Sequence, residues 1–483
     1  MMKRLIFFII AITVCLFSAC SDDDSFSTSK SDLLTFSRDT IMMDTVFSTV
    51  PTSTYTFWVY NKNNDGLRLN QVRLQRGNQS GFRVNVDGTY LDNTQGSFVN
   101  DLEIRKGDSI RVFVELTSGL RDADAPQLVE DNIIFSLESG VEQRVNLRAY
   151  SWDAILCSDI VISQDTVIST SRPIVVYGGI KVENGVTLTI NAPARFFFHS
   201  GAGIDVFGRL LVNPQGDSQN VVFRGDRMDN MFDYLPYDRV SGQWKGIRIH
   251  DTSNGNILCN VDIHSSEYGI VCDSSAYDSL TYRLFLENAI IHNCKGPGVK
   301  AVNSNVAMLN CQITNVLGDC VGIFGGSALL IYSTIAQFYP FNAERGVALR
   351  FTNYHENNDY PLYFFACYNS IITGYADDEI MGDSRNKDIE FGYFFTNSIL
   401  RTPKDAGNTS SELFRNIIWE TPTDNVQGEA LFKNIDTENL FYDFHLSENS
   451  VARGLAIPLE TVGFDRDGVE RGINPDAGCY QFR

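Results

Sequence analysis

Three segments near the middle of the chain share one pattern: Asn260-Val261-Asp262-Ile263-His264-Ser265, Asn288-Ala289-Ile290-Ile291-His292-Asn293 and Asn310-Cys311-Gln312-Ile313-Thr314-Asn315. A looser fourth segment, Tyr332-Ser333-Thr334-Ile335-Ala336-Gln337, continues the series. The segments start at positions 260, 288, 310 and 332, so they are 28, 22 and 22 residues apart. Each is followed by a glycine and a β-branched residue, with the glycines at Gly269, Gly298, Gly322 and Gly346. A period of this length indicates a repeat protein.

The repeats predict a right-handed parallel β-helix, in which each turn of the chain, or coil, carries short strands. A single coil cannot bury its own apolar face, but stacked coils form a continuous core. We expect the isoleucine at the fourth place of each segment to point inward and to stack on that of the next coil. The last place, held by Ser265, Asn293 and Asn315, is expected at a turn, where asparagine tolerates left-handed backbone geometry. The glycine that follows is expected to permit a sharp bend.

Segments on both sides of the repeats extend the β-helix to residues 153–483. Residues 178–190, 203–210 and 243–249 resemble the opening coils of β-helix proteins from Bacteroidetes, which have a pectate-lyase-like fold. Residues 465–471 and 475–480 resemble the closing segment of the same group, although Cys479-Tyr480-Gln481 stands where Ala-Tyr-Glu is usual. The resemblance implies the fold. It does not imply an activity, because this fold hosts lyases, hydrolases, adhesins and inert scaffolds.

Residues 35–152 have a different pattern, typical of a β-sandwich. Short runs rich in β-branched and aromatic residues, such as 55–60, 82–86 and 110–114, are separated by turn sequences. Residues 102–110 resemble the late-strand signature of immunoglobulin-like modules of bacterial surface proteins. We therefore expect an all-β chain, with an N-terminal immunoglobulin-like β-sandwich followed by the β-helix.

The N-terminus has the order of a secretory signal: basic Lys3 and Arg4, an apolar run, then small residues before Cys20. The apolar run is shorter than the roughly 20 residues that span a bilayer. Residues 16–20 resemble a bacterial lipobox, which implies a signal peptide over 1–19 and lipidation of Cys20. The acidic residues 22–24 resemble the tag that sends Bacteroidetes lipoproteins to the outer face of the outer membrane. Residues 20–34 are expected to form a flexible tether.

The charge and the cysteines narrow the possible partners and chemistry. Without residues 1–19 the chain has 37 basic and 59 acidic residues, a net charge of −22, which excludes nucleic acid as a partner. The eight cysteines beyond Cys20 show no CxxC spacing, and several lie in apolar contexts. We expect buried free thiols rather than a disulfide framework or a metal site.

Asp377, Asp378 and Glu379 form the only dense acidic triplet near the repeats. Paired carboxylates can act as general acid and base on a glycan, or bind Ca²⁺ through their oxygens. The alternative is a solvated loop after Thr373-Gly374-Tyr375. The motifs of polygalacturonase-like hydrolases do not occur as a set, and no arginine-rich groove motif of pectate-lyase-like enzymes stands out.

His264 and His292 hold the same place in successive segments. If both point outward, they lie about 4.8 Å apart, the spacing of neighbouring strands. Two imidazoles at that distance can share a metal ion. The alternative is a polar ladder on the surface, since no third ligand is evident in the same phase.

Aromatic residues cluster around two insertions in the predicted β-helix. Five of them are candidates for stacking on sugar rings, because flat apolar rings match the apolar faces of sugars: Tyr234, Tyr237, Trp244, Tyr363 and Tyr375. The alternative is that these rings fill or cover the core.

These observations predict a surface-exposed lipoprotein, anchored in the outer membrane, whose β-helix binds a glycan or a partner protein. Two rival functions stay open: a polysaccharide lyase or glycoside hydrolase that acts on acidic polysaccharide, and a structural subunit of an outer-membrane complex. No cofactor is predicted apart from the Ca²⁺ option.

Overall fold

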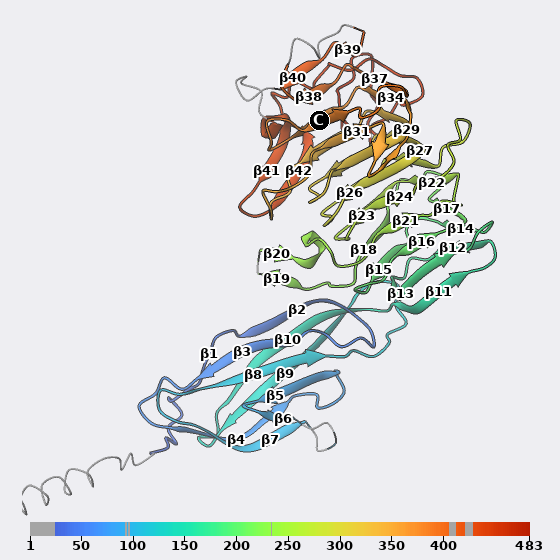
Figure 1. Cartoon of the computed structure of the whole chain (residues 1–483). Coiled ribbons are helices and arrows are strands. Elements are labelled where there is room, and N and C mark those ends of the chain that lie inside the picture. Colours follow the sequence, from blue (N-terminus) through green and yellow to red (C-terminus); the bar gives the residue numbers. More distant parts are fainter. Residues whose placement is uncertain (1–24, 92–93, 95–96, 233, 405–411, 421–427) are drawn as a thin grey trace, which may run out of the picture. The chain divides into compact units, whose positions relative to one another are not determined.

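The computed structural model describes residues 25–91, 94, 97–232, 234–404, 412–420 and 428–483, so Cys20 and the predicted signal peptide lie outside the described residues. The described chain is all-β apart from short 3-10 turns, and it divides into two compact units, Met1–Asp153 and Ala154–Arg483 (Figure 1). Among the described residues, no helix has the length and apolar character needed to cross a membrane.

The first unit contains two five-stranded sheets. In the order of pairing, one sheet consists of β1 (Thr35–Phe36), β3 (Tyr55–Tyr60), β8 (Ser109–Leu116), β5 (Phe82–Val86) and β6 (Thr89–Tyr90). The other consists of β2 (Thr40–Phe47), β10 (Glu142–Trp152), β9 (Gln127–Leu137), β4 (Leu67–Leu74) and β7 (Phe98–Ile104). Alternating residues of both sheets, such as Phe57, Val112, Phe135 and Leu147, form one core. The immunoglobulin-like assignment of this unit stays a prediction.

The end of the predicted tether packs against the first unit, while the tether assignment of residues 20–34 stays a prediction. Phe26 pairs with Gly66, the guanidinium of Arg68 lies over the Phe26 ring at 4.5 Å, and Leu34 is buried. The segment is mostly polar, so its composition did not indicate that Phe26 and Leu34 attach it to the first unit.

The second unit is a parallel β-helix, whose 26 strands pair from coil to coil along three faces. We name these faces sheets A, B and C. Sheet A starts with the first halves of β11 (Ile155–Ile162) and β13 (Ile174–Val182). It continues with β15 (Arg195–Phe198), β18 (Val221–Gly225), β23 (Val261–His264), β26 (Ile290–His292), β28 (Gln312–Thr314), β30 (Thr334–Gln337), β35 (Ile371–Gly374), β38 (Ile399–Arg401) and β40 (Ile418–Glu420).

Sheets B and C complete each coil. Sheet B contains the second halves of β11 and β13, then β16 (Ile204–Val206), β21 (Ile247–Ile249), β24 (Ile270–Cys272), the first halves of β27 (Val299–Leu309) and β29 (Val321–Ile331), β31 (Leu349–Thr352) and β36 (Ile380–Asp383). Sheet C contains β12 (Thr166–Ile168), β14 (Thr187–Ile190), β17 (Arg209–Val212), β22 (Asn256–Cys259), β25 (Leu284–Glu287), the second halves of β27 and β29, β34 (Leu362–Tyr368), β37 (Phe391–Thr396) and β39 (Phe414–Arg415).

The repeat segments occupy β23, β26, β28 and β30, with the register that their alignment predicts. Ile263 pairs with Ile291, Ile291 with Ile313 and Ile313 with Ile335, and all four side chains are fully buried. Ser265, Asn293 and Asn315 have φ of 58°, 52° and 55°, which confirms the left-handed turn. The first places, Asn260, Asn288 and Asn310, are also left-handed. In these three segments both corners of sheet A are therefore formed by short polar residues, whereas the fourth segment has Tyr332 at its left-handed first place.

The glycines after the segments have a different role from the predicted one. Gly269 and Gly298 are not in the left-handed region. A Cβ atom at either position would collide with backbone of the next coil, at Gly298 for the first glycine and at Cys320 for the second. These glycines permit a close approach of neighbouring coils rather than a bend.

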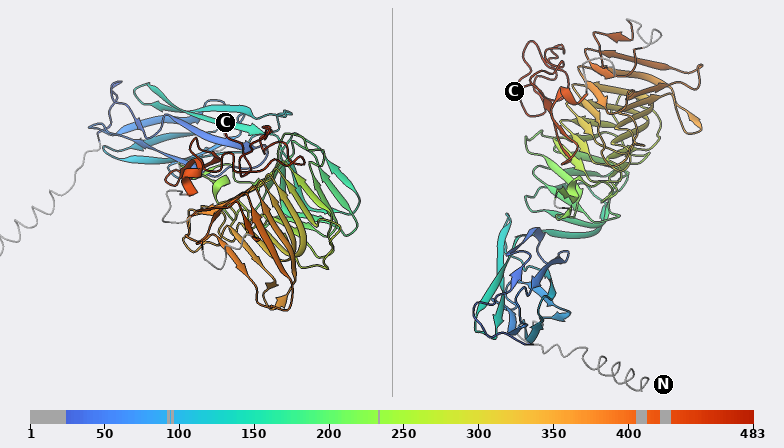
Figure 2. Two further views of the ribbon diagram at one scale, coloured as in Figure 1. Left: turned by 90° about the horizontal axis from the view of Figure 1, so that it is seen from above. Right: turned by 90° about the vertical axis from the view of Figure 1, so that its left-hand side faces the viewer.

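The C-terminal segment, residues 428–483, covers the outer side of sheet A. It contains the 3-10 turn η3 (Gly428–Leu431) and the hairpin of β41 (Phe432–Asp436) and β42 (Phe441–Leu446). Phe432, Phe444 and Cys479 pack against Ala336, Ile371 and Ile399 of sheet A. Figure 2 shows this segment, in dark red, along one side of the stacked coils. Two small hairpins also project from the coils, β19 (Asn230–Phe232) with β20 (Leu235–Pro236) and β32 (Tyr354–His355) with β33 (Asn358–Asp359), and the 3-10 turn η2 (Tyr237–Arg239) follows β20.

The prediction of free, buried thiols is confirmed for the eight cysteines in the described part of the chain. None forms a disulfide, and all except the half-buried Cys157 are buried. Burial raises the pKa of Cys272 and Cys311 to about 12, so these thiols stay protonated.

Candidate functional site

The outward sides of the three sheets differ in character, and sheet C presents a partly exposed aromatic surface. The later coils of sheet A, from β30 to β40, are covered by the C-terminal segment. Sheet B carries a column of charged side chains that includes Lys181, Asp205 and Arg248. Arg248 forms a 2.8 Å ion pair with Asp273, so part of this charge is neutralised locally. Sheet B therefore has the polarity of an ordinary solvated face.

Sheet C carries an apolar column on its outward side. Successive coils place Leu211, Ile257, Phe285, Ala307, Leu329, Ala366 and Phe394 in register. Because side chains of a strand alternate between its two faces, the fully buried inward column runs beside it and includes Leu258, Leu286, Met308 and Leu330. Ala307 and Ala366 are buried and the larger members of the column are half-buried, so exposed rings beside the column are needed to make it a binding surface.

A β-bulge in β34 adds two exposed aromatic rings to this surface. The register with β29 shifts between Gly326 and Ser327, which pair with Leu362 and Phe364, so Tyr363 has no partner of its own. A bulge re-aims side chains. As a result the consecutive Tyr363 and Phe364 are both exposed, at 45% and 42%.

Neighbouring rings hold these two side chains in place. Tyr363 stacks on Tyr277 with 4.6 Å between ring centroids, and the Tyr277 hydroxyl and Ser327 Oγ form a hydrogen bond of 2.6 Å. Phe364 packs on Phe394 at 5.7 Å. Tyr282 and Phe285 form a further pair at 6.0 Å on an earlier coil. We name the set Tyr277, Tyr282, Phe285, Tyr363, Phe364 and Phe394 the aromatic face.

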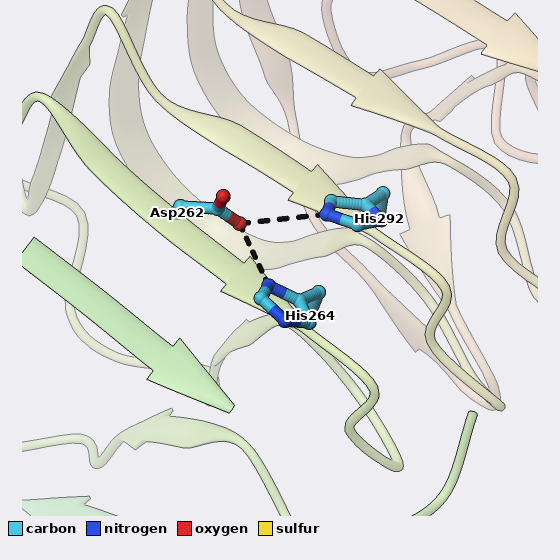
Figure 3. Close-up of side chains that lie close together, drawn as sticks. All are labelled: Asp262, His264 and His292. Carbon is cyan, nitrogen blue, oxygen red and sulfur yellow. Dashed lines mark hydrogen bonds and ion pairs between the residues drawn. The ribbon is translucent and has the colours of Figure 1, made fainter. Parts of the chain in front are cut away.

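The second candidate site is a cluster of Asp262, His264 and His292 on the outward side of sheet A. The three lie on β23 and β26, where His264 pairs with His292. Figure 3 shows one carboxylate oxygen of Asp262 between the two rings, and dashed lines join it to both. Asp262 Oδ1 lies 2.8 Å from His264 Nδ1 and 3.4 Å from His292 Nε2, and the stacked ring centroids are 4.8 Å apart.

This geometry bears on both interpretations of the histidines. They form a ladder with the predicted spacing, and Asp262 supplies the third ligand type that was not recognised from the sequence. The signal was present, because residues i and i+2 of a strand share a face. The two histidines hold the pKa of Asp262 far below its usual value, against the opposing effect of burial. Burial in turn lowers the pKa of His264.

The acidic triplet does not form a site. Asp377 and Asp378 are exposed, whereas Glu379 is fully buried. The Glu379 carboxylate accepts hydrogen bonds from the backbone N–H groups of Ala348 and Ala376, at 3.0 and 2.8 Å. Burial raises the pKa of Glu379 to about 8. The three carboxylates thus point into different environments, and the expectation of one solvated loop is wrong for Glu379.

The five predicted sugar-stacking residues do not converge. Trp244 is a correction: it is fully buried, stacks on Phe198 at 4.4 Å and donates a hydrogen bond from Nε1 to the carbonyl oxygen of His264. Tyr375 packs against Phe338. Tyr237 lies below the guanidinium of Arg227 at 3.9 Å. Tyr234 is exposed and stacks on Phe232 at 5.8 Å, and Tyr363 belongs to the aromatic face.

Comparisons with known proteins add little to the geometry. No family model matches the sequence, and no curated protein matches it. A family 123 glycoside hydrolase from Clostridium perfringens is similar at 8% identity over 25% of this chain and 26% of that chain, with a TM-score of 0.18. BcpA, the major pilin subunit of Bacillus cereus, is similar at 10% identity over 28% and 44%, with a TM-score of 0.15. The Agl-KA catalytic domain is similar at 13% identity over 76% and 80%, with a TM-score of 0.23.

The chain thus spans only 26% and 44% of the length of the first two proteins. TM-scores this low carry no argument about this chain. The fold and the site define its class, which is an all-β protein with a long parallel β-helix.

Proposed function

We propose that this protein is a lipoprotein on the outer face of the outer membrane whose β-helix binds a neutral glycan chain along the aromatic face. The observation that supports the binding role is the bulge that exposes Tyr363 and Phe364 side by side. A bulge that turns two large apolar side chains into solvent costs burial free energy, so a ligand that covers them offers a reason for it.

The chemistry of the face favours a glycan over other ligands. Flat rings suit the apolar faces of sugars, and the tyrosine hydroxyls can bond to sugar hydroxyls. The outward column of sheet C runs over successive coils, about 4.8 Å per coil. Phe285 lies three coils before β34, which carries Tyr363 and Phe364, so a linear polymer along the column can contact rings on several coils. A formal net charge of −20 opposes the approach of a polyanion, which favours a neutral polymer over uronate-rich chains.

The proposed location rests on the sequence of residues 16–24. In this proposal the lipid on Cys20 anchors the chain and the first unit, as an immunoglobulin-like spacer, precedes the binding unit. Cys20→Ser, compared with the parent chain by membrane fractionation and protease treatment of intact cells, tests it. We expect the parent chain to be membrane-bound and cleaved from outside, and the variant to be released from the membrane. A parent chain protected from external protease contradicts the surface location.

Binding is tested with the full-length chain on a panel of neutral and acidic glycans. We expect binding of at least one neutral polymer, and a loss of about tenfold or more in Tyr363→Ser/Phe364→Ser. The matched control is Phe232→Ser/Tyr234→Ser, which removes another exposed stacked pair that lies outside the aromatic face. Loss of binding in the control alone assigns the ligand to that hairpin instead.

Other outcomes of the same experiment identify the rival functions. New reducing ends or unsaturated products from an acidic glycan establish a hydrolase or a lyase. A partner protein that co-purifies from detergent-solubilised membranes, and is lost in Tyr363→Ser/Phe364→Ser, makes the aromatic face a protein interface. Co-purification that the variant leaves unchanged supports a structural subunit. If no glycan binds, any one of these three results contradicts the proposed glycan-binding function.

A further inference from the structure

The cluster of Asp262, His264 and His292 is the one group of three or more potential metal ligands found among the described residues. One donor atom from each residue can be chosen such that all lie within 4.8 Å of one another. The cluster lies on sheet A, away from the aromatic face on sheet C, so its role is independent of the glycan proposal.

The two spacings that involve Asp262 are close to those around a small transition-metal ion. Zn²⁺ is bound at about 2.0–2.2 Å by imidazole nitrogen and carboxylate oxygen, so two donors at a tetrahedral angle lie roughly 3.4 Å apart. Asp262 Oδ1 and His292 Nε2 are separated by 3.4 Å, and Asp262 Oδ1 and His264 Nδ1 by 2.8 Å. A shift of about 0.6 Å in one side chain, well within rotamer adjustment, opens the second distance to the same value.

The composition of the cluster identifies the class of ion. Two imidazoles and one carboxylate are the usual ligands of zinc and of other divalent first-row metals, whereas Ca²⁺ and Mg²⁺ require mainly oxygen ligands. The side chains of Asp262 and His292 are each about a quarter exposed, at 24% and 25%, so solvent reaches part of the cluster. His264 is almost buried, which limits its motion.

We propose that Asp262, His264 and His292 form a binding site for one divalent transition-metal ion, with Zn²⁺ as the best match. The ion links β23 to β26 and so ties two successive coils together. Without a metal ion, Asp262 Oδ1 itself contacts both imidazoles, at 2.8 Å and 3.4 Å.

The surroundings of the cluster are compatible with this role. The cation nearest in register is Arg224 on β18, and its guanidinium is engaged by Asp238 at 3.6 Å and by the carbonyl oxygen of Arg227 at 2.8 Å. On the next coil, Gln312 of β28 accepts a hydrogen bond of 2.9 Å from the Tyr480 hydroxyl.

Titration calorimetry of the full-length chain with ZnCl₂, after dialysis against EDTA, tests the site. We expect one tight Zn²⁺ per chain, a higher Tm in the presence of Zn²⁺, and no comparable effect of CaCl₂. Asp262→Asn and His292→Gln should each weaken Zn²⁺ binding by more than the 10–100-fold typical of an outer-shell partner. His199→Gln is the matched control, because His199 forms a 2.7 Å pair with Asp226 outside the cluster and should bind Zn²⁺ like the parent chain.

A further measurement on the unmodified chain covers the case in which a variant does not fold. Zn²⁺ should shift the ¹⁵N ring resonances of two histidines. Zn²⁺ binding that is equal in the parent chain and the variants, or that leaves all histidine resonances unmoved, overturns the proposal and assigns the ion to surface carboxylates. Neither result affects the glycan proposal, because that proposal is tested by glycan binding to the parent chain and to Tyr363→Ser/Phe364→Ser.

Discussion

The phenol of Tyr480 donates a hydrogen bond to the side-chain oxygen of Gln312, 168 residues earlier in the chain, at 2.9 Å. Both residues are buried, and the backbone N–H of the neighbouring Cys479 donates to Thr334 Oγ1 at 3.1 Å. These bonds attach the C-terminal segment to sheet A, whose outward column contains Gln312, Thr334, Ile371 and Ile399.

The first prediction concerns this attachment. Tyr480→Phe leaves the Gln312 oxygen buried without its partner, which should lower the free energy of unfolding by about 1–3 kcal/mol. Urea unfolding measures the change. Tyr282→Phe, at an exposed ring, serves as control and should be neutral. Equal stability of the parent and Tyr480→Phe would show that the bond contributes nothing.

For the isoleucine column of sheet A we predict a larger loss of unfolding free energy. Ile313 is fully buried between Ile291 and Ile335. Ile313→Ala should therefore cost about 2–5 kcal/mol in unfolding free energy, because neighbouring coils cannot collapse into the cavity. Leu280→Ala removes a similar side chain that is 94% exposed, and should cost almost nothing. A small loss at Ile313 would mean that the stack repacks freely.

The left-handed corners predict a dependence on residue type. Asn288 has φ of 53° at the start of a repeat segment. Asn288→Val should be less stable than Asn288→Gly by about 1–2 kcal/mol, since a β-branched residue is disfavoured in this backbone conformation and glycine is not. Thermal unfolding of the two variants gives the difference directly, and a valine variant as stable as the glycine variant contradicts the argument.

His445 should make the stability of the C-terminal segment depend on pH. Its ring lies between Asp467 at 3.0 Å and Asp443, and it stacks on Tyr480 at 4.1 Å. The hydrogen bond to Asp467, reinforced by Asp443, raises the pKa of His445. The stabilisation is therefore complete below the unfolded-state pKa of about 6.5 and is lost as pH rises through the higher folded-state pKa. His445→Gln should remove this part of the fall in Tm between pH 6 and pH 8.5; an unchanged profile would count against it.

Glu379 should produce a second, separable pH dependence. Burial raises its pKa to about 8 from an ordinary value of 4.5. Between these values the folded chain keeps a proton that the unfolded chain has released, so the free energy of unfolding falls as pH rises, by at most about 1.4 kcal/mol per pH unit. Urea unfolding at several pH values should show a flatter slope for Glu379→Gln than for the parent chain. Glu344→Gln, at an exposed position, should keep the parent slope.

The β-helix could be predicted because the repeat determines the register in which strands of neighbouring coils pair. The phase of Asn260, Asn288 and Asn310 aligns the strands, and the alternation of side chains then determines which residues are buried. The same rule was sufficient to place Asp262 beside His264, two residues away on the same strand face, although the prediction considered only the positions that recur from coil to coil.

Other features depend on contacts that no local pattern records. The run Tyr363-Phe364-Phe365 is aromatic throughout, so its pattern does not reveal the bulge that exposes two of the rings and buries the third. Trp244 was expected beside an insertion at the surface, but a stacking contact with Phe198 places it in the core. The covering of sheet A involves residues more than 100 positions apart, and sequence spacing does not encode such pairings.

The unpaired cysteines have a consequence for the conditions under which this chain can mature. No disulfide joins any of the eight cysteines described, and seven of their thiols are enclosed in the packed interior. Thiol exchange requires an accessible thiolate, and these groups are neither accessible nor ionised. The fold should therefore be the same in a reducing compartment as in an oxidising one. Such a chain needs no oxidant to reach its native state, and no reductant can undo it.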